Sequence, residues 1–147
     1  MSQLRVFAMC VFSLALINTS CQSYTSGLQR SVVRANETAA IALIRTIFIA
    51  ERTYSLSNDG EYATLRQLVD SGFLDARYGG EKPLRDYVVT LKVTPKTPGA
   101  AEGSYTCNMD PDTTGEIVGR HLYIDSTSSG IHINDSQPAT ASDKFID

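Results

Sequence analysis

The chain has 147 residues, with 13 lysines and arginines against 16 aspartates and glutamates, which gives a formal net charge of −3 at pH 7. This balance excludes a general nucleic-acid binder, because such proteins carry a strongly basic face. The 3 cysteines are too few for a disulfide scaffold, and the length suits one domain with one modest core.

An almost wholly apolar run lies at the start of the sequence. Residues 4–17 (LRVFAMCVFSLALI) contain a single charge, that of Arg5. A positive start followed by about a dozen apolar residues is typical of a secretory signal peptide, and the run is shorter than the roughly 20 residues of a membrane-spanning helix. We therefore predict that residues 1–20 are a signal peptide, of lipoprotein type, and that the protein is exported.

Cys21 directly follows this segment and is the predicted lipidation site. A small residue before a cysteine, here Ser20, resembles a bacterial lipobox, in which the thiol receives a diacylglyceryl group, although Asn18 stands where leucine is usual. The alternative is an ordinary signal peptide cut near Ser20 or Cys21, with secretion and no anchor. Cys107 is expected to be a buried, inert thiol, or to bridge to Cys21 if the latter is retained without lipid.

A tether and a long helix are predicted next. Residues 21–27 (CQSYTSG) are small and polar, which indicates a flexible tether. Apolar residues then recur at steps of three and four from Leu28 to about Leu56, as in an amphipathic helix that ends at Asn58-Asp59-Gly60. The stripe expected to be buried comprises Val33, Ala40, Ile41, Ile44, Ile47, Phe48 and Tyr54, and the opposite side carries Arg30, Arg34, Glu37, Arg45 and Arg52.

A short helix and four strands follow in the prediction. Thr64 is the expected N-cap of the short helix, with Gln67 as its capping-box partner. Segments 87–94, 104–109, 120–125 and 130–134 are rich in alternating apolar and polar residues, which favours strands. We expect an α+β domain over residues 28–147, in which the long N-terminal helix packs across a four-stranded antiparallel meander and the tail after Asp135 is irregular.

Segment 110–116 (DPDTTGE) is a candidate calcium loop. Oxygen-bearing residues at its first, third, fifth and seventh places, with glycine at the sixth, resemble the first half of such a loop; these residues are Asp110, Asp112, Thr114 and Glu116. The bidentate glutamate of the twelfth place is missing, because His121 stands there. The alternative is an acidic turn without metal, and no other cofactor is expected.

Other candidate chemistry is sparse. His121 and His132 lie on neighbouring predicted strands and are expected on the same side, where they could bind zinc with Tyr123 or Cys107, or could simply be surface histidines. The sequence contains no nucleophile elbow, phosphate loop or paired-histidine motif, so we do not expect an enzyme. Glu51 and Glu61 flank a loop and are interpreted as solvated helix ends.

Several segments, in order, share the pattern of one known family. They are LQRSVVRANETAAIALIRTIFIAERTY, which contains the Ala35-Asn36-Glu37 step, then TLRQLVDSGFLD, GRHLYIDSTSSGIHIN and PATASDKFI. Together they resemble the globular head of type IV pilins and type II secretion pseudopilins, over about residues 28–146. The chain departs from this family because it lacks the Gly-Phe prepilin cleavage site, the glutamate after it and the apolar half-helix that packs a filament core.

The resemblance implies an exported, lipid-anchored, pilin-like protein with a structural or binding role. It would be held to a membrane through Cys21, face the periplasm or the cell surface, and contact envelope, pilus or secretion proteins. Some pseudopilins bind calcium in a loop of the sheet region, in line with segment 110–116. Two alternatives remain: a stand-alone periplasmic lipoprotein that binds a small ligand or an envelope partner with a reused pilin fold, and a subunit that joins a filament tip through its sheet.

Overall fold

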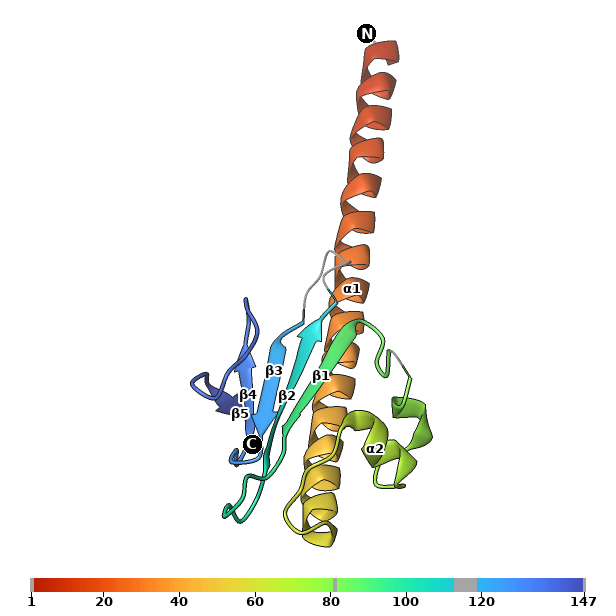
Figure 1. Ribbon diagram of the computed structural model, residues 1–147. Helices are drawn as coiled ribbons and strands as arrows, with labels where there is room; N and C mark the ends of the chain where they lie inside the picture. Colours follow the sequence, from red (N-terminus) through yellow and green to blue (C-terminus); the bar gives the residue numbers. More distant parts are fainter. Residues whose placement is uncertain (1, 81, 113–118, 147) are drawn as a thin grey trace.

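One long helix runs across one antiparallel sheet (Figure 1). The structure is a computed structural model that describes residues 2–80, 82–112 and 119–146, with side chains described from residue 27 onward. Its helices are α1 (Ser2–Ser57), α2 (Leu65–Asp70) and the 3-10 turn η1 (Ala76–Tyr78), and its strands are β1 (Tyr87–Thr94), β2 (Ser104–Pro111), β3 (His121–Asp125), β4 (Ile131–Asn134) and β5 (Phe145–Ile146).

The sheet has the strand order β1-β2-β3-β4-β5, and every neighbouring pair is antiparallel. The predicted α+β class and the antiparallel meander are therefore confirmed. The prediction of an irregular tail was wrong at its end, where β5 pairs with β4 through Ile131 opposite Ile146. A strand of two residues is too short to show an alternating pattern in the sequence, and it is held by pairing with β4.

The C-terminal half of α1 buries one face against the sheet. Its buried residues recur at steps of three and four, as a helix of 3.6 residues per turn requires; they are Ala40, Leu43, Ile44, Ile47, Ala50, Glu51 and Ser55. The sheet contributes alternate side chains from its central strands, including Tyr105, Cys107 and Met109 of β2 with Leu122 and Ile124 of β3. The helix and the sheet together form the hydrophobic core. Val33, at the start of the expected stripe, is only half-buried.

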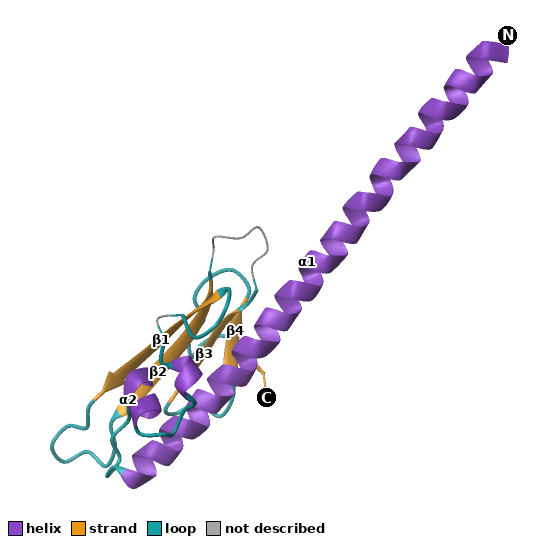
Figure 2. Ribbon diagram, turned by 90° about the vertical axis from the view of Figure 1, so that its right-hand side faces the viewer, coloured by secondary structure: helices purple, strands orange, loops and turns teal. Residues whose placement is uncertain are grey.

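The N-terminal part of α1 continues beyond the end of the sheet (Figures 1 and 2). Leu28 and Val32, near the point where the helix leaves the sheet, are 52% and 56% exposed. Residues 21–27, the expected tether, have helical backbone within α1. The segment 2–57 has no proline and Gly27 as its only glycine, so nothing in its sequence interrupts the helix. Export and removal of residues 1–20 remain a prediction.

An ion pair joins α1 to the start of β3. The guanidinium of Arg120 donates to Glu37, with 2.9 Å between Nε and Oε1, and its Nη2 also contacts the same oxygen. The hydroxyl of Tyr87 donates to the carbonyl of Arg120 at 2.9 Å. The sequence pattern assigned Glu37 to the solvated side of the helix, but its carboxylate is partly buried because Arg120, directly before β3, lies against it.

The connection from α1 to the sheet follows the prediction closely. Thr64 is the N-cap of α2 and forms the full capping box with Gln67. Leu68 is fully buried, and the ring of Phe73 lies edge-on to that of Tyr54, with 5.4 Å between centroids. The short α2 and the turn after it therefore pack apolar side chains against the C-terminal half of α1.

Because only one face of α1 is buried, substitutions on its two faces should change the free energy of unfolding by different amounts. Ile44 is fully buried and Ile49 is 63% exposed on the same helix. Ile44→Ala is expected to lower the free energy of unfolding by about 2–5 kcal/mol, because it leaves a cavity against the sheet. Ile49→Ala is expected to change it by no more than about 0.5 kcal/mol. Urea denaturation of the two variants measures both values, and equal losses would contradict the packing described.

Candidate functional site

Cys21 lies within α1, and its side chain is outside the part that the structure describes. Its lipidation therefore remains a prediction. Among the described residues, none of the helices combines the length and the apolar character needed to cross a bilayer.

The predicted calcium loop is only half described. Thr114 and Glu116 fall in residues 113–118, outside the described residues. The two described carboxylates each face a side chain of another segment: Asp110 Oδ1 lies 2.6 Å from His121 Nδ1, and Lys82 Nζ donates to Asp112 Oδ2 at 2.6 Å. Within the described ranges, His, Cys, Asp and Glu side chains form no group of three or more suited to a metal. Calcium binding at this loop stays a prediction.

The histidines and Cys107 do not share a site. His121 contacts Asp110 on β2, while His132 lies opposite Tyr123 in the strand register. Cys107 lies opposite Ile124 in the core, on the other face of the sheet, so its proposed role as a zinc ligand beside the histidines was wrong. The expectation of a buried, inert thiol is confirmed: Cys107 is free and fully buried, and burial, with a smaller effect of Glu51, raises the pKa of its thiol to about 12.

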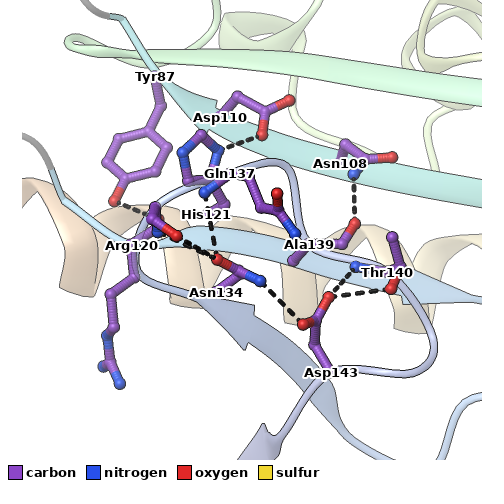
Figure 3. Close-up of polar contacts among 11 residues, drawn as sticks. Tyr87, Asn108, Asp110, Arg120, His121, Asn134, Gln137, Ala139, Thr140 and Asp143 are labelled. Carbon is purple, nitrogen blue, oxygen red and sulfur yellow. Dashed lines mark hydrogen bonds and ion pairs between the residues drawn. The ribbon is translucent and has the colours of Figure 1, made fainter.

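The outer face of the sheet carries a polar network that holds the C-terminal segment (Figure 3). Asn108 donates to the carbonyl of Ala139 at 3.0 Å, and Asn134 donates to Asp143 Oδ1 at 2.8 Å. The other oxygen of Asp143 accepts from the backbone and the hydroxyl of Thr140, and these hydrogen bonds lower the pKa of Asp143. The network explains how a short β5 is positioned, and we assign it a structural role.

A pocket of about 280 Å³ lies where α1 ends beside the loops of the sheet. Four segments surround it: the last turns of α1, the loop between α1 and α2, the start of β2 with the loop before it, and the turn between β3 and β4. Its lining residues are Phe48, Arg52, Ser55, Leu56, Tyr62, Glu102, Tyr105, Ser126 and Ser128. This volume is just below the range of about 300–1,000 Å³ that holds drug-sized ligands, so the pocket suits one small molecule.

Glu51 is the most unusual residue beside this pocket. It lies on the same face of α1 as the lining residues Phe48 and Ser55 and is fully buried. Its Oε2 accepts the backbone N–H of Ala63 at 3.0 Å, whereas its Oε1 has no hydrogen-bond partner among the described residues. Burial raises the pKa of Glu51 to about 7, against the opposing effect of the Ala63 hydrogen bond. The carboxyl group is therefore about half protonated near neutral pH.

Tyr105 presents a second unpartnered polar atom. Its side chain is 2% exposed, and its hydroxyl has no hydrogen-bond partner among the described residues. Burial, followed by the charge of Glu51, raises the pKa of this phenol well above its usual value. Buried polar atoms are almost always hydrogen-bonded in native proteins, so two such atoms beside one pocket mark it as the candidate functional site.

Sequence reasoning missed this site because it treated Glu51 as a solvated helix end. The position itself held a signal: Glu51 falls four residues after Ile47 and seven after Ile44, which places it on the apolar stripe. An acidic side chain at a core position of a helix is rare and calls for a partner or a shifted pKa. Glu61, by contrast, is half-buried and accepts the backbone N–H of Lys96 at 3.1 Å.

The buried carboxyl group makes stability depend on pH. Because the pKa of Glu51 is about 7 in the folded protein and 4.5 in the reference state, the folded protein retains a proton that the unfolded chain releases between these values. Stability is therefore full below about pH 4.5, falls as the pH rises to about 7 and stays low above it. The loss is roughly 3 kcal/mol, at about 1.4 kcal/mol per pKa unit.

Glu51→Gln removes this titration and keeps an oxygen for the Ala63 N–H. We expect the variant to be about 2–3 kcal/mol more stable than the wild type at pH 8 and nearly equal to it at pH 4.5. Urea unfolding across this range measures the difference. Glu61→Gln is the matched control and should keep the pH dependence of the wild type. An unchanged pH dependence in Glu51→Gln would show that Glu51 does not titrate as described.

No family model matches the chain, and neither a curated protein nor a solved structure matches it.

Proposed function

We propose that the chain is an exported, lipid-anchored protein of pilin-like fold with a structural or binding role at the cell envelope. The observation that carries this proposal is the arrangement of α1, whose C-terminal half packs across an antiparallel sheet while the helix continues beyond it (Figure 2). That arrangement agrees with the resemblance of residues 28–146 to pilin and pseudopilin heads. A signal-like segment and Cys21 stand where a prepilin has its cleavage site and apolar half-helix.

The membrane connection follows from the chemistry of Cys21. A diacylglyceryl group carries two acyl chains, and each buried methylene contributes about 0.8 kcal/mol, so two chains anchor a protein stably where one does not. A head held in this way is confined to the membrane surface, which raises its effective concentration toward other envelope proteins. The anchor would therefore replace the apolar half-helix as the means of membrane attachment.

Two surfaces of the head are available to a protein partner. Outside its buried stripe, α1 exposes large apolar side chains, among them Ile49 and Leu56 at 63% and 83% exposure. Strand β1 has no neighbouring strand on its outer side among the described residues, apart from the isolated bridge between Leu84 and Tyr87. An exposed strand edge accepts a further strand from a partner. Both surfaces suit contact with pilus, secretion or other envelope proteins.

Metabolic labelling with a radioactive fatty acid tests the anchor. We expect label on the wild-type protein, none on Cys21→Ser, and full label on Cys107→Ser, because Cys107 is buried in the core. Wild-type protein should fractionate with membranes, and Cys21→Ser should be released. An unlabelled wild type, or equal label on Cys21→Ser, would contradict the proposal.

The second candidate is a stand-alone periplasmic lipoprotein that binds a small ligand, and the pocket at the end of α1 favours it. Purification of the intact lipidated protein from its own envelope separates the two. Pilus or secretion components in the purified material support the first candidate. Their absence, together with a small molecule retained by the protein, supports the second.

A further inference from the structure

We propose that the pocket at the C-terminal end of α1 binds one neutral sugar residue. The first candidate function assigns no ligand to the head, and the second names only a small ligand, so this proposal adds the chemical class of the ligand. In Figure 1 this end of α1 lies at the opposite end of the helix from the N-terminus. In a protein tethered through Cys21, the pocket would therefore face away from the membrane.

Hydroxyl groups dominate the polar part of the pocket wall. The wall takes Ser55 from α1, Tyr62 from the loop after α1 and Tyr105 from β2. The β3–β4 turn adds Ser126 and Ser128. A hydroxyl both donates and accepts a hydrogen bond, so this wall complements a ligand that presents several hydroxyls. The Ser128 hydroxyl also donates to Asp125 at 2.9 Å, which fixes the turn.

Aromatic side chains supply the apolar part of the wall. The rings of Tyr62 and Tyr105 are tilted against each other with 5.0 Å between centroids, and Phe48 lines the same pocket. Tyrosine combines an apolar ring with a polar end, so these side chains can cover the C–H surface of a sugar while their hydroxyls meet its oxygens. A fully apolar ligand would leave the hydroxyl wall without partners, which costs free energy.

Two opposite charges at the pocket favour a neutral ligand. Arg52 lines the pocket and forms no ion pair with the described residues. Glu102 lines it as well and accepts a long hydrogen bond of 3.4 Å from the Tyr62 hydroxyl. A guanidinium attracts an anion and repels a cation, and a carboxylate does the reverse. Together they give no net preference for a charged ligand, while each can hydrogen-bond to sugar hydroxyls.

One unpartnered atom belongs to a residue of the pocket wall. Tyr105 lines the pocket, and its hydroxyl has no hydrogen-bond partner among the described residues. Glu51, whose Oε1 also lacks a partner there, is fully buried and is not one of the lining residues. A ligand hydroxyl can donate to the Tyr105 hydroxyl or accept from it, so a hydroxyl-bearing ligand suits this atom.

Titration of the full-length protein in detergent with methyl glycosides tests the proposal. The probes are the methyl glycosides of glucose, galactose, mannose and N-acetylglucosamine, with glucosamine and glucuronate as charged controls. We expect at least one neutral glycoside to bind with a roughly millimolar Kd and both charged sugars to bind more weakly. Failure of all four neutral probes to bind at tens of millimolar, or tighter binding of a charged sugar, would overturn the proposal.

Variants locate the binding. Tyr105→Phe keeps the ring and removes only the unpartnered hydroxyl, so the fold is retained, and we expect binding to weaken about fivefold. Ser126→Ala at the β3–β4 turn should weaken it as well. Tyr78→Phe, in η1 and away from the pocket lining, is the control and should leave binding unchanged. Unchanged binding in both Tyr105→Phe and Ser126→Ala would place the sugar elsewhere and refute the assignment.

The lipid anchor and the sugar site can be tested independently of each other. Cys21→Ser removes the predicted lipid and leaves every pocket residue in place, so it should bind the glycoside as the wild type does. Loss of fatty-acid label with intact sugar binding would confirm the independence of the two sites. Loss of sugar binding in Cys21→Ser would contradict a site formed by the head alone.

Discussion

The contact between α1 and the sheet is the constraint on which the rest of the head depends. The sheet has one apolar face, and the helix has one buried stripe that includes Ala40, Ile44 and Ile47. Neither surface can remain exposed to water without a large free-energy cost, so the two elements stabilise each other. The Glu37–Arg120 pair and the short α2 act at the two ends of this contact.

The same contact places an acidic side chain where an apolar one would stabilise more. Glu51 continues the buried stripe and reaches the N–H of Ala63, which ties the loop after α1 to the helix. Its other oxygen and the Tyr105 hydroxyl lack partners among the described residues. Natural proteins tend to break local rules at functional sites and compensate elsewhere. These two unpartnered atoms lower the stability of the head, and they lie beside the pocket for which we propose a binding role.

Sequence patterns located most elements of the head because each pattern has a clear physical cause. The Thr64–Gln67 capping box and the alternation in Tyr87–Thr94 depend on local hydrogen bonding and side-chain direction, and both were placed correctly. Strand β5 and the pocket depend on contacts between segments far apart in the chain. The charge of Glu51 suggested an exposed side chain, whereas its position on the apolar stripe of α1 indicated a buried one. The structure shows that the side chain is buried. The predicted lipidation of Cys21 would depend on processing enzymes, so packing within the chain does not bear on it.

Amide hydrogen exchange of the full-length protein tests the central packing contact most directly. If the sheet covers the C-terminal half of α1, the amides of residues 43–51 should exchange as slowly as those of residues 105–109 in β2, because both open only on global unfolding. Amides of residues 28–32, where α1 leaves the sheet, should exchange much faster. Rapid exchange across residues 43–51 while β2 stays protected would show that the helix and the sheet do not form one core.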